Sequence, residues 1–98
     1  MYENRQHERQ STALSGAIRA DGSDAAPKNC EIVDLSPGGA RIKIYTCLEK
    51  GAVVFLQIEE MGEYEVGIAW FRRPMAGLNF NVAPEIMTEV VMAIAMYR

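Results

Sequence analysis

The sequence predicts an all-β core, a small six-stranded antiparallel β-barrel, followed by a C-terminal α-helix. Two observations carry this prediction. Short segments alternate apolar and polar residues between clusters of turn residues, and from Pro84 onward the apolar residues recur at helical spacing. Short strands at this spacing, separated by turns, are typical of small barrels. With 98 residues, the chain is long enough for a modest core, and we expect residues 1–98 to form a single domain.

Six segments are predicted as strands: residues 11–20, 29–35, 40–45, 52–60, 63–71 and 77–82. Three of them show clear alternation and place apolar side chains on one face: Ile42 and Ile44; Val54, Leu56 and Ile58; Tyr64, Val66, Ile68 and Trp70. Met61 and Gly62 predict a tight hairpin turn, because glycine tolerates the positive φ that such turns need. The barrel is therefore expected over residues 11–82.

Residues 84–97 are predicted to form the helix. Pro84 is a favoured first helical residue, and Glu85 and Glu89 lie near the positive end of the helix dipole. The apolar stripe at helical spacing consists of Ile86, Val90 and Ile94, with Met87 and Val91 beside them. We expect this stripe to pack on one mouth or side of the barrel. The alternative is a partner-binding helix, whose surface would be made adaptable by Met87, Met92 and Met96.

Charge and hydropathy exclude several classes of protein. The formal net charge of −3 argues against a general nucleic-acid-binding protein, which would have a strongly basic surface, so no DNA or RNA partner is expected. No apolar run is long enough to cross a membrane, and the first residues lack the apolar stretch of a secretory signal. We therefore expect a cytoplasmic protein that does not insert into membranes.

The sequence has few residues suited to catalysis or metal binding. His7 is the only histidine, and Cys30 and Cys47 lie in apolar runs without the spacing of metal ligands. We expect both cysteines to be buried and reduced, since cytosolic proteins rarely keep a disulfide. Because no nucleophile–base pair or metal cluster is visible, the sequence predicts neither an enzyme nor a cofactor.

Two short motifs stand out from this background. Arg5 and Arg9 form an R-x-x-x-R pattern on residues 1–10, a segment with few apolar anchors that we expect to be a flexible arm. After 24 further residues, Asp34, Ser36 and Gly39 form a D-x-S-x-x-G pattern directly behind an apolar strand. Each motif alone needs no ligand: exposed arginines are normally solvated, and Asp and Ser stabilise turns through their own backbone.

In this order and spacing, the two motifs resemble the signature of the PilZ family, whose members bind the bacterial second messenger cyclic di-GMP. The segment "VGIAWFRRPMAGLNF" also resembles the late hairpin of that family, and the resemblance extends from Arg5 to the closing helix. It implies a PilZ-like split barrel and a ligand site at Arg5, Arg9, Asp34, Ser36 and Gly39. The further contacts that it suggests are Asn4, Gly38, Arg41 and Trp70. Asn4 stands where many relatives carry a basic residue, which bears on whether one ligand or a stacked pair binds.

The chemistry of the motifs suits such a ligand. An arginine fork can contact the N7 and O6 acceptors of guanine, stack on the base or pair with a phosphate. The N1–H and N2–H donors on the other edge of guanine match the carboxylate of Asp34 and the hydroxyl of Ser36. We expect the ligand to fold the arm onto the barrel, which would convert a ligand concentration into a change of shape. If Gly39 has a positive φ, a β-branched residue there would be strained.

Two functions are therefore carried forward. The first is a cyclic di-GMP receptor that relays the signal to a downstream protein by conformational change. The second is a PilZ-like adaptor that signals through protein–protein contacts without binding nucleotide, as family members lacking the arginines do. The intact motifs favour the receptor.

Overall fold

A computed structural model of the chain describes residues 10–20, 22 and 25–97. It contains six strands and one helix: β1 (Gln10–Ala20), β2 (Lys28–Ser36), β3 (Gly39–Lys43), β4 (Val53–Ile58), β5 (Gly62–Arg72), β6 (Met75–Phe80) and α1 (Pro84–Tyr97). The predicted fold class, a six-stranded barrel with a C-terminal helix, is confirmed. Within the described part of the chain, no helix is long and apolar enough to cross a membrane.

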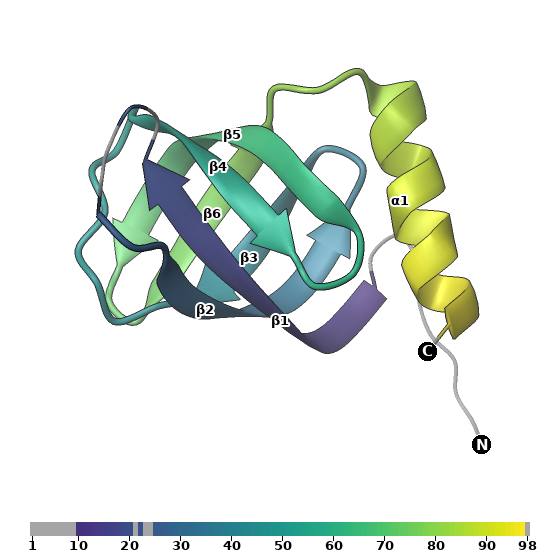
Figure 1. The fold of residues 1–98 in the computed structure, drawn as a ribbon, viewed down its shortest axis with the longest axis horizontal. Coiled ribbons are helices and arrows are strands. Elements are labelled where there is room, and N and C mark those ends of the chain that lie inside the picture. Colours follow the sequence, from purple (N-terminus) through teal and green to yellow (C-terminus); the bar gives the residue numbers. More distant parts are fainter. Residues whose placement is uncertain (1–9, 21, 23–24, 98) are drawn as a thin grey trace.

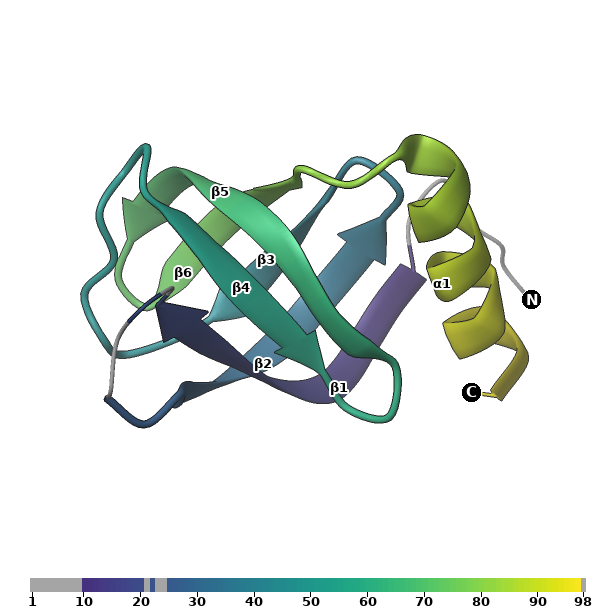
Figure 2. The same ribbon diagram turned by 45° about the horizontal axis from the view of Figure 1, so that its top comes forward.

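The strands close into a barrel in the order β1-β2-β3-β6-β5-β4, and every neighbouring pair is antiparallel. Helix α1 lies at one end of this barrel in both views (Figures 1 and 2). The first residues of β1 and the turn between β2 and β3 lie at the same end. The β3–β4 loop and the β5–β6 turn lie at the opposite end.

The core follows the predicted two-residue alternation over most of the barrel. Ile42, Ile44, Leu56 and Val66 are at most 1% exposed, as a strand with one face toward the interior requires. Gly62 has a φ of 109°, which confirms the reason given for glycine, but it is the first residue of β5, and the turn itself consists of Glu59, Glu60 and Met61. The sixth strand starts two residues earlier than predicted, at Met75, because the turn before it is shorter than the sequence suggested.

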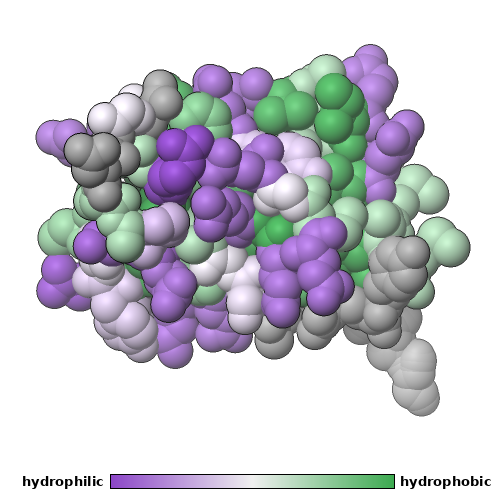
Figure 3. Space-filling view, viewed as in Figure 1, coloured by the Kyte–Doolittle hydropathy of each residue, from purple (hydrophilic) through white to green (hydrophobic). Residues whose placement is uncertain are grey.

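Helix α1 buries a stripe that differs from the predicted one by one member. Met87, Val90 and Ile94 are at most 7% exposed, whereas Ile86 is 51% exposed. The buried residues are spaced i, i+3 and i+7, so Ile86 falls on the edge of the packed face. Met92 and Met96 are exposed, and Figure 3 shows hydrophobic side chains gathered at the α1 end of the molecule.

Strand β5 contains the largest departure from simple alternation. The register between β5 and β6 shifts between Ile68 and Trp70, so that Phe71 packs against the core and Trp70 is 38% exposed. A bulge inserts one residue and turns the following side chains to the opposite faces. The expectation that Trp70 shares the inner face of Val66 and Ile68 is therefore wrong.

The two cysteines are free thiols in different surroundings. Cys30 is half-buried, and burial raises the pKa of its thiol to about 11. Cys47 is exposed, because residue 47 lies in the β3–β4 loop rather than in a strand, and Arg73 Nη2 donates to its Sγ at 3.1 Å. The prediction of burial is wrong for Cys47.

Candidate functional site

The D-x-S-x-x-G motif forms the sharp corner between β2 and β3. Ser36 and Gly39 lie opposite each other in the ladder, so only Pro37 and Gly38 form the turn. The Ser36 hydroxyl donates to the Gly39 carbonyl at 3.3 Å, and the Phe80 N–H donates to the Gly38 carbonyl at 3.0 Å. The corner is thus held both by its own side chain and by the end of β6.

Asp34 is the one described polar residue buried in the barrel wall, at 3% exposure. Arg41 lies opposite it on β3, and its Nε donates to Asp34 Oδ2 at 2.7 Å. The Arg41 side chain remains 49% exposed. Hydrogen bonding to Asp34, and then the charge of that carboxylate, raise the pKa of Arg41. A buried carboxylate requires such a partner, because its desolvation is otherwise uncompensated.

Gly39 is required by the closeness of two strands. A Cβ added to Gly39 would overlap the carbonyl oxygen of Leu78 on β6. Gly39 is not among the glycines with positive φ, so the positive φ considered for it is wrong. Its lack of a side chain permits backbone contact instead. Gly38, its neighbour in the turn, has open space around it.

Trp70 lies on the outer wall of the barrel above Gly77. These residues are register partners on β5 and β6, and a Cβ added to Gly77 would overlap the indole ring. Gly77 thus provides the space into which the ring settles. The Gly-x-x-Phe pattern of Gly77 and Phe80 is visible in the sequence, but it does not indicate the role of Gly77 under the tryptophan.

A cavity of about 380 Å³ joins the corner to Trp70. Its lining contains five of the predicted contact residues: Ser36, Gly38, Gly39, Arg41 and Trp70. The remaining lining residues, which were not predicted, are Ala40, Ala69, Gly77, Leu78 and Asn79. Asp34 lies behind Arg41 rather than in the lining, and Asn4, Arg5 and Arg9 lie outside the described residues.

The start of β1 lies against the same corner. Gln10 is the register partner of Leu35, and Ser11 is the partner of Asp34. The polypeptide therefore enters the barrel directly beside the D-x-S-x-x-G motif, although 22 residues separate Ser11 from Asp34 in the chain.

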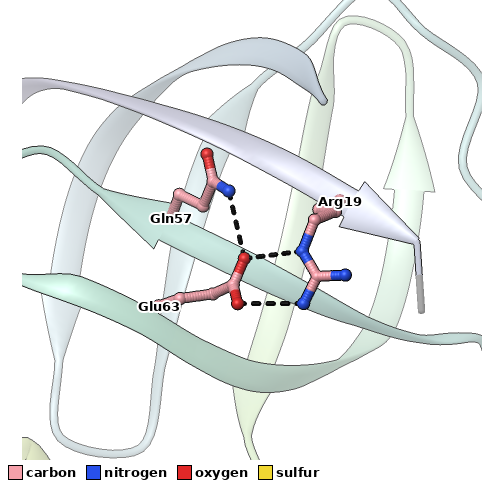
Figure 4. Close-up of polar contacts among 3 residues, drawn as sticks. All are labelled: Arg19, Gln57 and Glu63. Carbon is pink, nitrogen blue, oxygen red and sulfur yellow. Dashed lines mark hydrogen bonds and ion pairs between the residues drawn. The ribbon is translucent and has the colours of Figure 1, made fainter. Parts of the chain in front are cut away.

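A larger hollow of about 560 Å³ lies elsewhere, over β1, β4 and the β4–β5 turn. Two carboxylates, Glu59 and Glu63, line it. Glu63 is ion-paired with Arg19 and accepts a hydrogen bond from Gln57 (Figure 4). Because its lining has acidic but no basic side chains, this hollow is poorly suited to an anion, and the smaller cavity at the corner is the better candidate for a phosphate-bearing ligand.

Comparison with known families matches residues 3–92 to the PilZ domain. The chain belongs to the PilZ family. PilZ domains form a family of cyclic di-GMP receptors, and they are non-catalytic receptor or adaptor domains. No curated protein matches the sequence.

Two solved structures share the fold. The inhibitor of motility MotI/DgrA of Bacillus subtilis superposes with a TM-score of 0.65 at 16% identity, over 99% of this chain. The match covers 54% of the Bacillus chain, so the present chain spans about half of its length. The uncharacterized Legionella protein Lpg0364 superposes with a TM-score of 0.63 at 20% identity, over 94% of this chain and 98% of the other.

Proposed function

We propose that this PilZ domain binds cyclic di-GMP between the Arg5–Arg9 motif and the β2–β3 corner and passes the signal to a partner protein. The observation that carries the proposal is the pairing of Ser11 with Asp34, because it brings the chain that follows Arg9 to the D-x-S-x-x-G motif. The described chain thus begins, at Gln10 and Ser11, directly beside the second motif, although 24 residues separate Arg9 from Asp34 in the sequence.

The groups around the corner suit a guanine dinucleotide. Arg41 presents a half-exposed guanidinium to the cavity, and Trp70 offers an aromatic face beside it. Bases stack on aromatic and guanidinium planes, and arginine pairs with phosphate or with the guanine O6 and N7 acceptors. The cavity volume of about 380 Å³ lies within the usual range of small-molecule sites, about 300–1,000 Å³.

The relay consists of a change in the arm. We expect ligand to order residues 1 to 9 against the corner, while the closed barrel changes little. Amide hydrogen exchange with and without cyclic di-GMP measures this directly. New protection confined to the arm and the corner is expected, and equal protection in both states would contradict the relay.

A second candidate is the nucleotide-independent adaptor. The observation in its favour is that Asp34 is already ion-paired with Arg41 and Ser36 already donates to Gly39. In that case the corner would have a structural role only, because the Asp34 carboxylate and the Ser36 hydroxyl are already engaged within the protein and would not be available to a ligand. The two candidates differ in one measurable quantity, the affinity for cyclic di-GMP.

Isothermal titration calorimetry with cyclic di-GMP, GMP, GTP and cyclic di-AMP decides between them. We expect binding of cyclic di-GMP with a preference over the other three nucleotides. Arg5→Ala and Arg9→Ala should each reduce the free energy of binding by about 1–3 kcal/mol, the range for a bidentate arginine–guanine contact. The exposed Lys28→Ala is the control. Absence of both heat and a thermal shift with cyclic di-GMP would contradict the receptor and favour the adaptor.

A further inference from the structure

The outer face of β3, β6 and β5 carries a group of cations that the nucleotide site does not use. Lys43 and Arg72 are both register partners of Met75, so the three side chains form one row across the wall. One further backbone contact follows this row, because the Ile44 N–H donates to the Pro74 carbonyl. Tyr45 comes next in the β3–β4 loop, and Arg73 lies in the β5–β6 turn. We call Lys43, Tyr45, Arg72 and Arg73 the cationic ledge. All four are exposed.

The ledge contrasts with the charge of the whole molecule. The chain has a net charge of −3, and four glutamates gather on the β4–β5 hairpin, at residues 59, 60, 63 and 65. Among the described residues, neither Lys43 nor Arg72 has an ion pair; Glu31 is the register partner of Lys43 but forms no ion pair with it. The ledge is therefore a local positive surface on an acidic protein.

Its composition favours a protein partner over a nucleic acid or a membrane. Three cations are fewer than the roughly 6–10 phosphate contacts typical of nucleic-acid binding, or the roughly 4–8 basic residues of a lipid-binding cluster. Tyr45 is 67% exposed, and Met75 is half-buried between Lys43 and Arg72. Tyrosine, methionine and arginine are enriched at protein interfaces.

We propose that the cationic ledge is a docking surface for an acidic segment of a protein partner. Carboxylates of the partner pair with Lys43, Arg72 and Arg73, and an apolar or aromatic side chain packs on Tyr45 and Met75. The inference goes beyond the proposed function and does not rest on it, because the β5–β6 turn lies at the end of the barrel opposite the β2–β3 corner. The strands keep Lys43, Met75 and Arg72 at fixed spacing, since cross-strand neighbours lie about 5 Å apart.

The test uses fluorescence anisotropy of the full chain with short fluorescein-labelled peptides. One peptide combines glutamate with leucine and tyrosine, and its matched control has glutamine for every glutamate. We expect saturable binding of the acidic peptide only, weakening as salt is added. The double substitution Lys43→Glu and Arg72→Glu should weaken it at least about tenfold, because attraction is replaced by like-charge repulsion.

The double substitution Lys28→Glu and Lys50→Glu changes the net charge equally outside the ledge and should leave peptide affinity unchanged. Equal losses of peptide affinity in both double variants, or no binding of the acidic peptide, would overturn the proposal that the ledge is a docking surface. Tighter binding to phosphatidylserine vesicles or to a single-stranded oligonucleotide than to the peptide would also overturn it. Calorimetry with cyclic di-GMP on the same variants keeps the two proposals separate. The ledge variants should lose far less nucleotide affinity than Arg5→Ala or Arg9→Ala, because one residue pair separates Lys43 and Arg72 from Arg41 and Trp70 in the ladder.

Discussion

Two arginine–carboxylate pairs stabilise two walls of this barrel, β2–β3 and β1–β4–β5, in different ways. At the corner, the Asp34 carboxylate is buried and Arg41 covers it from the solvent side. At the β4–β5 hairpin, Arg19 and Glu63 form two hydrogen bonds of 2.8 and 2.9 Å, but both side chains are about one-third exposed (Figure 4). The hairpin pair has the better geometry, yet the corner pair has more influence on stability, because only there would a lost partner leave a buried charge.

The two regions also differ in how closely the backbones approach. At the corner, β3 and β6 are so close that Gly39 has no room for a side chain. At the hairpin, Arg19 reaches Glu63 across the face of the sheet and also lies over the Phe55 ring, 4.7 Å from its centroid. Long exposed side chains adjust to a substitution more readily than packed backbone does. The corner is therefore the region that tolerates a substitution less well.

The largest effect is expected from Gly39→Ala. The new Cβ overlaps the Leu78 carbonyl oxygen, which belongs to the backbone of β6, a strand paired on both sides, and cannot move aside alone. We expect a loss of about 3 kcal/mol, the upper part of the range for overpacking. Denaturant unfolding measures it. The matched control is Gly38→Ala, which meets open space and should change stability by less than about 0.5 kcal/mol. Similar losses in the two variants would contradict the close approach of β3 and β6.

A second prediction concerns Arg41→Ala. It leaves the Asp34 carboxylate buried with one partner fewer, and we expect a loss of about 2 kcal/mol. This value lies below the usual range for buried pairs because Arg41 is itself half-exposed. Adding Asp34→Asn to the variant should restore part of the stability, since the unpaired charge is then removed. A double variant less stable than Arg41→Ala would show that Asp34 acts chiefly through other groups.

A smaller effect is expected from Gly77→Ala, which displaces the Trp70 ring rather than the backbone. We expect a loss of about 1 kcal/mol, at the low end for overpacking, because the exposed ring can turn toward solvent. Trp70 is the only tryptophan, so its fluorescence emission should shift to longer wavelength without interference. If Trp70 contacts the ligand, affinity for cyclic di-GMP falls in parallel. An unchanged emission spectrum would contradict the position of the ring over Gly77.

The smallest effect is expected at the hairpin, from Glu63→Gln. Hydrogen bonds from Arg19, and then from Gln57, lower the pKa of Glu63 to about 2. Since this folded-state pKa is depressed, the stabilisation is present above the unfolded value of about 4.3 and is lost as the pH falls toward 2. The variant should melt slightly below the wild type at pH 7 and together with it near pH 2. A difference that persists at low pH, or that survives high salt undiminished, would contradict an exposed ion pair.

The sequence by itself determined the local features of this protein. Two-residue alternation predicted which faces of β3 and β4 turn inward, and the change of period at Pro84 predicted α1, because both patterns depend only on near neighbours. The motif Asp34-x-Ser36-x-x-Gly39 predicted the corner for the same reason, since turn chemistry is local. The family was also evident from these short motifs and their order.

Only the tertiary structure decided how distant strands meet, and this determined most of the candidate site. The bulge that turns Trp70 outward, the pairing of Ser11 with Asp34 and the approach of Gly39 to Leu78 all depend on register between strands. Register is set by the packing of the whole barrel, and a shift of one residue exchanges the inner and outer faces of a strand. For the same reason the sequence assigned Asp34 to a ligand, whereas its position opposite Arg41 makes it first the buried partner of that arginine.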